Sequence, residues 1–213
     1  MKIFYDAEFT GLHKDTTLIS IALVDEMGWG LYAEFNDYDH KQVDEWIEKN
    51  VLENTINLRR DSNNIKIKFD FETKYPQCQL LFGSKETLRP IVLKWLSKYD
   101  EIELVSDVGH YDVVLLIDFL YGSALQSPIC TYIDVNTMIA NEYSISINEA
   151  FDISRDGMAT LSEYEDTDIN KHNALYDTLV LRNIYNSLAK PKAKRKRKTT
   201  KKNNKEKGEL IRS

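Results

Sequence analysis

Three short segments carry the side chains that could bind a cation. The first, Asp6-Ala7-Glu8, ends an apolar stretch that begins at Lys2. Because alternate residues of a strand face the same side, both carboxylates would project together and could share a cation. The same spacing recurs at Asp70 and Glu72, so the spacing alone does not mark a site. Asp6 and Glu8 differ in ending an apolar strand, where two buried carboxylates would need a metal ion to neutralise them. The alternative is that both acids are simply exposed at the strand end.

The second and third segments each open an apolar helical stretch. Asp107 and Asp112 lie where a short strand gives way to an apolar run, and either could be a ligand. In the third segment, His172 precedes Asp177 by five residues, which on one helix would turn the two side chains about 140° apart. We therefore expect His172 on the loop or first turn and Asp177 on the helix. Taken alone, the pair would fit a polar helix start with a solvated acid.

The order of these segments resembles the DEDDh group of 3′–5′ exonucleases, which are DnaQ-like members of the ribonuclease-H-like superfamily. Asp6-x-Glu8-x-Thr10-Gly11-Leu12 is similar to that family's first motif, Tyr111-Asp112 to the end of its second, and His172-Asn173-Ala174-Leu175-Tyr176-Asp177 to its third. The likeness spans residues 1–188, with an interruption at 53–84, and is greatest to the small single-domain exoribonucleases. One departure concerns the second motif: Ser106-Asp107-Val108 stands where the family commonly has His-Asn.

The resemblance implies a set of roles. Asp6, Glu8, Asp112 and Asp177 would hold two Mg²⁺ or Mn²⁺ ions, with Asp107 a rival to Asp112, and such a pair of ions suits phosphodiester hydrolysis. His172 would be the general base, since its ordinary pKa of about 6.5 lets it accept a proton at neutral pH. Phe9, Thr10 and Leu12 would hold the 3′ end of the substrate. The implied substrate is RNA or another single-stranded nucleic acid, and several relatives are homodimers.

Other function classes remain open at this stage. A DNA exonuclease of the proofreading type, or a non-catalytic nucleic-acid-binding module on the same fold, would share these motifs. Aspartyl-nucleophile phosphohydrolases also begin with paired acids, but they resemble Asp-x-Asp, whereas Glu8 stands here, and no convincing later lysine motif follows. The last alternative is a structural or interaction protein in which these acids have no chemical role.

Around these motifs, the sequence predicts an α/β fold. Residues 2–6, 17–24 and 29–35 are predicted to form an antiparallel meander, and further elements alternate as strands and helices, which implies a mixed sheet flanked by helices. We read residues 53–84 as a variable insertion, with a strand at 65–71 whose edge could pair in a homodimer. The remaining predicted elements are helices at 40–52, 87–99 (with Pro90 in its first turn), 111–121 and 171–188, and strands at 102–106 and 129–135.

Charge divides the chain into two regions. Residues 190–213 hold twelve Lys or Arg and two Glu, a balance of +10, whereas residues 1–189 carry −16. We therefore predict an exonuclease domain at 1–189 and a basic, disordered tail at 190–213. Such a tail suits a nucleic-acid partner, although it could equally serve solubility alone.

The sequence also excludes some locations and partners. It has no apolar stretch of the ~18 residues that a membrane span requires, and its first residues lack the apolar core of a secretory signal. Cys78 and Cys130 have no metal-ligand spacing and are expected to be reduced thiols. We therefore expect a cytoplasmic protein with no membrane partner.

Overall fold

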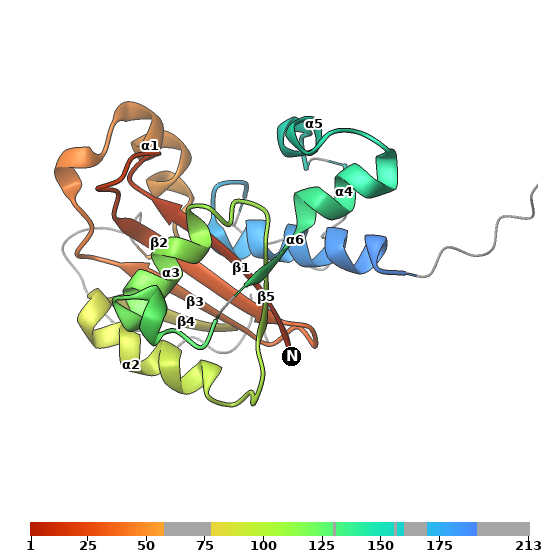
Figure 1. Ribbon diagram of the computed structural model, residues 1–213. Helices are drawn as coiled ribbons and strands as arrows, with labels where there is room; N and C mark the ends of the chain where they lie inside the picture. Colours follow the sequence, from red (N-terminus) through yellow and green to blue (C-terminus); the bar gives the residue numbers. More distant parts are fainter. Residues whose placement is uncertain (58–77, 130, 156, 160–169, 191–213) are drawn as a thin grey trace, which may run out of the picture.

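The computed structural model describes residues 1–57, 78–129, 131–155, 157–159 and 170–190. A six-stranded sheet in the order β4-β3-β2-β1-β5-β6 forms its centre (Figure 1). β1, β2 and β3 pair in antiparallel fashion, while β4, β5 and β6 each pair parallel to a neighbour. The predicted meander and mixed sheet are confirmed. The strands are β1 Lys2–Phe9, β2 Leu18–Asp25, β3 Gly30–Phe35, β4 Cys78–Gly83, β5 Glu103–Ser106 and β6 Tyr132–Asp134.

Helices cover both faces of this sheet (Figure 1). α2 and α3 pack against one face, while α6 crosses the other face over β1 and β2 and is contacted by α4. The helices are α1 Glu45–Asn50, α2 Lys85–Leu96, α3 Asp112–Tyr121, α4 Val135–Tyr143, α5 Ile147–Asp152 and α6 Ala174–Leu188. Three short 3₁₀ helices, His40–Gln42, Leu52–Asn54 and Ala124–Gln126, complete the described elements.

β1 separates the two cores and so determines which way its acids point. Ile3, Tyr5 and Ala7 are buried in the core that includes α2 and α3, whereas Phe4 belongs to the core with α4 and α6. Because strand side chains alternate, Asp6 and Glu8 share the face of Phe4 and point toward α6. β1 continues to Phe9, so these acids lie within the strand instead of ending it as predicted.

The predicted helix at 40–52 is wrong in extent. A 3₁₀ turn, the six-residue α1 and a second 3₁₀ turn occupy this region, because Asp39 and Asp44 each accept a backbone N–H and cap a new start. Trp46, which we expected on the buried face, is 55% exposed.

The predicted insertion at 53–84 also extends too far. Its last residues form β4, which pairs parallel with β3 as an edge strand of the main sheet. Their apolar run lacks the alternation that marked the other strands. The predicted strand at 65–71 lies outside the described residues.

Pro90 lies in the second turn of α2, not in the first, because Ser84 caps the helix earlier than predicted.

α4 and α5 had no counterpart in the sequence prediction, and β6 is shorter than the strand expected at 129–135. Within the described residues, no helix is both long and apolar enough to cross a membrane.

Candidate active site

The second motif is positioned by a tight loop between β5 and α3. Asp112 begins α3, is 1% exposed, and accepts a hydrogen bond of 3.0 Å from Ser106 Oγ at the end of β5. The loop packs so closely on β6 that a Cβ at Gly109 would lie 2.2 Å from the Tyr132 ring. Glycine fits there without displacing the ring, and the loop holds Asp107 and Asp112 after the end of β5, next to β1.

The third motif is a turn followed by a capped helix. His172 has a φ of +65°, and its backbone N–H donates to Asp177 Oδ2 at 2.8 Å. Asn173 then caps α6, and its Oδ1 accepts the N–H groups of Leu175 and Tyr176. His172 thus lies before the helix and Asp177 on it, as the 140° argument predicted.

These motifs converge into two groups of possible ligand atoms. Glu8, His172 and Asp177 each offer one atom within 4.8 Å of the others, and Asp6, Asp107 and Asp112 do the same. All five residues assigned from the sequence as ligands or base are therefore brought together. Asp107 joins them, so the structure places both rivals of the second motif beside Asp6.

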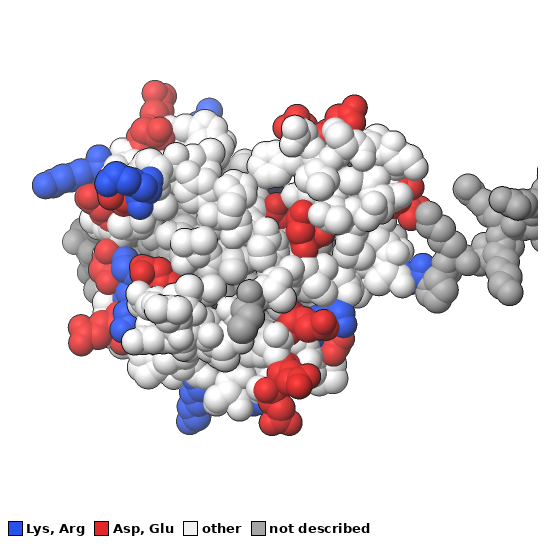
Figure 2. All heavy atoms as spheres, in the orientation of Figure 1, with Lys and Arg blue, Asp and Glu red and all other residues white. Residues whose placement is uncertain are grey.

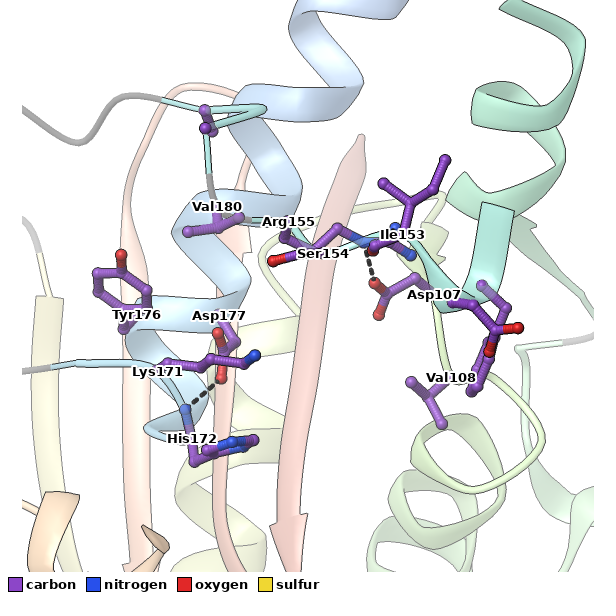
Figure 3. A pocket seen from close by; sticks show the side chains of 14 residues that line it. Asp107, Val108, Ile153, Ser154, Arg155, Lys171, His172, Tyr176, Asp177 and Val180 are labelled. Carbon is purple, nitrogen blue, oxygen red and sulfur yellow. Dashed lines mark hydrogen bonds and ion pairs between the residues drawn. The ribbon is translucent and has the colours of Figure 1, made fainter. Parts of the chain in front are cut away.

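Asp107 is held from two directions by residues that the sequence analysis missed. Its carboxylate pairs with Arg155 Nε at 3.2 Å (Figure 3). Its backbone carbonyl accepts a hydrogen bond from Asn136 Nδ2. Arg155 also donates to Asn136 Oδ1 and to the carbonyls of Ala150 and Ile153. The charge of Asp107 is thereby balanced by a guanidinium. No sequence signal marked Arg155, because its side-chain partners Asp107 and Asn136 are distant in the chain.

The electrostatics of the cluster oppose ionisation. Burial, and then the charges of Asp112, Asp177 and Glu8, raise the pKa of Asp6 well above its usual value. Burial followed by neighbouring carboxylates likewise raises the pKa of Glu8 and of Asp112. His172 shifts in the opposite sense: burial, and then the charge of Lys171, lower its pKa, which favours the neutral imidazole.

A cavity of about 640 Å³ opens beside these groups. On one side it is lined by Lys171, His172, Tyr176, Asp177 and Val180 from the α6 region, and on the other by Asp107, Val108 and Ile153–Arg155 (Figure 3). Figure 2 shows acidic side chains in the hollow between the sheet and the α4–α5 region.

The three residues expected to hold a substrate end lie at the end of β1 and just after it, and each is placed differently. Phe9 stacks on Tyr111, with ring centroids 5.3 Å apart and 14° between planes. Thr10 is 1% exposed, and its Oγ1 accepts the N–H of Thr17 at 2.8 Å and donates to Gln42, so it fixes the loop of residues 11–16. Leu12, at 73% exposure, projects from that loop.

A buried polar network supports the turn at His172. Glu34 is fully buried and accepts hydrogen bonds from the Tyr32 hydroxyl and from the backbone N–H groups of Ile56 and Asn57. Asn173 Nδ2 donates to the Tyr32 hydroxyl at 3.2 Å and to the Asn54 carbonyl at 2.7 Å. The network therefore joins β3 to the start of α6. The Trp46 ring meets the His172 ring edge-on, with centroids 5.2 Å apart.

Comparisons with known proteins identify the fold. No family model matches the sequence, and no curated protein is similar to it in sequence. Among solved structures, the nuclease domain of 3′hExo, a DEDDh family member bound to rAMP, aligns with a TM-score of 0.54 and 13% identity over 86% of this chain and 88% of that one. This chain has the fold of a DEDDh nuclease domain. A full-length 3′-exonuclease also aligns, with a TM-score of 0.52 and 15% identity over 86% of this chain and 78% of that chain. The fold predicted from the resemblance is confirmed.

The donor set of this site fits a hard divalent cation. Carboxylate oxygens are the ligands that Mg²⁺ and Mn²⁺ prefer, and carboxylates supply all three candidate ligands of one group and two of the three in the other. A cation among them would offset both the burial and the carboxylate repulsion that raise the pKa values of Asp6, Glu8 and Asp112.

Proposed function

We propose that this protein is a metal-dependent 3′–5′ exonuclease that hydrolyses phosphodiester bonds of single-stranded nucleic acid, with RNA preferred over DNA. One observation carries the proposal. Acids from β1, α3 and α6, together with His172, converge beside the central strand β1 in a chain that has the fold of DEDDh nuclease domains. Chance would not bring all five residues of three motifs to one place.

Asp6, Glu8, Asp112 and Asp177 are the proposed ligands for Mg²⁺ or Mn²⁺. Divalent cations held there would neutralise charge on the phosphoryl group, activate water and support the leaving 3′ oxygen. Asp112 is preferred to Asp107 because the Arg155 guanidinium already balances the Asp107 charge. Asp107 is then the residue through which Arg155 and Asn136 fix the second motif.

His172 is the proposed general base. A lowered pKa keeps its imidazole neutral at pH 7, so it can accept a proton from water. Its turn is held by the hydrogen bond from its backbone N–H to Asp177, which leaves both ring nitrogens available for chemistry. His172→Ala should lower turnover by about 10² to 10⁴ while changing metal affinity much less.

Phe9, Thr10 and Leu12 are proposed to hold the terminal nucleotide, each in its own way. Phe9 offers a ring face, Leu12 an exposed side chain that can wedge against a base, and Thr10 keeps the connecting loop in place. The preference for RNA follows the resemblance to small exoribonucleases, and the rAMP bound to the similar nuclease domain supports it.

The test measures hydrolysis of single-stranded RNA and DNA oligomers by the purified full chain in Mg²⁺, Mn²⁺ or EDTA. Asp6→Asn and Asp177→Asn should each lower turnover by orders of magnitude, and EDTA should abolish it. Asp118→Asn is the matched control, because this acid is exposed on α3 and away from the cluster. Full turnover in both ligand variants would overturn the proposal, and loss in Asp107→Asn with retention in Asp112→Asn would reverse the ligand assignment.

Two expectations belong to the same proposal. The domain of residues 1–189 would hold the whole active site, with residues 190–213 serving substrate capture, in a cytoplasmic protein. Homodimerisation follows only from the resemblance. Sedimentation of the full chain at micromolar concentration would refute the dimer by showing monomer alone.

A further inference from the structure

Four aromatic rings run in a row from the end of β1 to α5. Phe9 stacks on Tyr111, the Tyr111 ring meets His110 at a centroid distance of 5.2 Å, and the His110 ring lies 6.4 Å from that of Phe151. The row begins one residue after Glu8 and passes Tyr111, which directly precedes Asp112. It therefore starts at the candidate active site and leads away from it.

The outer half of the row is accessible. His110 is exposed, and Phe151 is 49% exposed, although aromatic side chains of this size are usually covered. Phe151 also lines the cavity shared by Asp107, His172 and Asp177. A nucleic-acid strand whose 3′ end lies at the acids can thus continue along this cavity to Phe151 without leaving the protein surface.

The charges along this path favour recognition of bases over recognition of phosphates. Arg155, which also lines the cavity, is paired with Asp107 and donates to three further oxygens. Lys171, the other cation in the lining, lies on the α6 side beside His172 and Asp177 (Figure 3). Asp152 lies beside Phe151 in the lining, so the wall near the rings is not basic. Rings in a wall that is not basic suit stacking on nucleobases, because every base has a face that can stack, whatever the sequence.

We propose that His110 and Phe151 form a stacking platform for the bases of single-stranded nucleic acid that lie upstream of the 3′-terminal nucleotide. The platform rests on the proposed function, since it extends that site and gives the enzyme a preference for unpaired, longer substrates. Bases paired in a duplex have their faces covered and would not use it.

The test compares substrate lengths. His110→Ala and Phe151→Ala should each lower kcat/KM on a ten-nucleotide single-stranded oligomer by about 5- to 150-fold, the range for loss of one stacked base. Cleavage of a dinucleotide should be unchanged, because it does not reach α5. Phe151→Trp should retain the long-substrate rate, and Tyr143→Ala, which removes an exposed aromatic ring on α4, is the matched control.

The salt dependence gives a second measure. Because stacking neutralises no phosphate, the platform variants should weaken binding without changing the slope of affinity against salt. Equal losses on dinucleotide and ten-mer, or no loss on either, would overturn the platform. An unchanged nucleic-acid affinity together with a changed oligomeric state in Phe151→Ala would instead assign this face to a second copy of the chain.

Failure of the platform can be separated from failure of the proposed function. Binding of a fluorescent ten-mer to the full chain is measured in EDTA, where no cleavage is expected. If the wild type cleaves nothing in Mg²⁺ or Mn²⁺ yet the platform variants weaken this binding, the platform stands and the exonuclease proposal fails. If the wild type cleaves the substrate and neither variant weakens binding, the exonuclease proposal stands and the platform fails.

Discussion

Replacing Asn173 by alanine tests how the fold positions His172 and Asp177. The side chain is 1% exposed; its oxygen caps α6, and its amide donates to Tyr32 and to the Asn54 carbonyl. Loss of the cap costs about 1 kcal/mol, and a partly buried carbonyl left without its donor adds about 1–2 kcal/mol. We expect Asn173→Ala to lower the free energy of unfolding by about 2–3 kcal/mol, which for a chain of this size lowers the Tm by roughly 4–12 °C.

Urea unfolding followed by circular dichroism measures this change, and two further variants separate its parts. Asn173→Ser keeps a capping oxygen but loses both donations, so it should fall between wild type and Asn173→Ala. Asn186→Ala makes the same substitution on the exposed side of α6 and should be nearly neutral, since alanine is the better helix former. If Asn173→Ala is as stable as Asn186→Ala, the network does not hold the helix start, and the reasoning is refuted.

Three further predictions concern pKa values and charge. Burial raises the pKa of Cys78 to about 12 from 9.0, so its alkylation by iodoacetamide at pH 8 should be about 10³-fold slower in the folded chain than in urea; equal rates by mass spectrometry would contradict this. Lys171 lowers the pKa of His172, so Lys171→Gln should move the ascending limb of the pH–rate profile to higher pH, and a shift to lower pH would be inconsistent with His172 as the base. Deleting residues 191–213 should reduce the salt dependence of kcat/KM on oligomers, since it removes most of a +10 segment that can displace counterions; identical slopes would exclude contact between that segment and the substrate.

Local pattern was sufficient to predict the elements that carry the acids. An apolar run with an acid at its start or end predicted β1, the start of α3 and the start of α6. The alternation of side chains along a strand correctly placed Asp6 and Glu8 on one face. The turn before α6 followed from helix geometry, because five residues on one helix cannot align His172 with Asp177.

Features built from distant partners were not predictable in this way. Arg155 acts through Asp107 and Asn136, and the buried Glu34 side chain accepts backbone N–H groups from residues more than twenty positions away. β4 was missed because an edge strand needs no alternating pattern, and Trp46 was misplaced because capping aspartates broke the expected helix. Arg155, Glu34 and β4 depend on tertiary contacts that no local period encodes, whereas the caps at Asp39 and Asp44 are local contacts that apolar spacing does not reveal.

The direction and products of cleavage test the central claim most directly. A single-stranded RNA labelled at its 5′ end is incubated with the full chain in Mg²⁺ or Mn²⁺, and the fragments are resolved by length over time. The account predicts a ladder that shortens one nucleotide at a time from the 3′ end, absent in EDTA and in Asp6→Asn. Labelled mononucleotide as the first product, internal cuts, or an unchanged ladder with Asp6→Asn would contradict it.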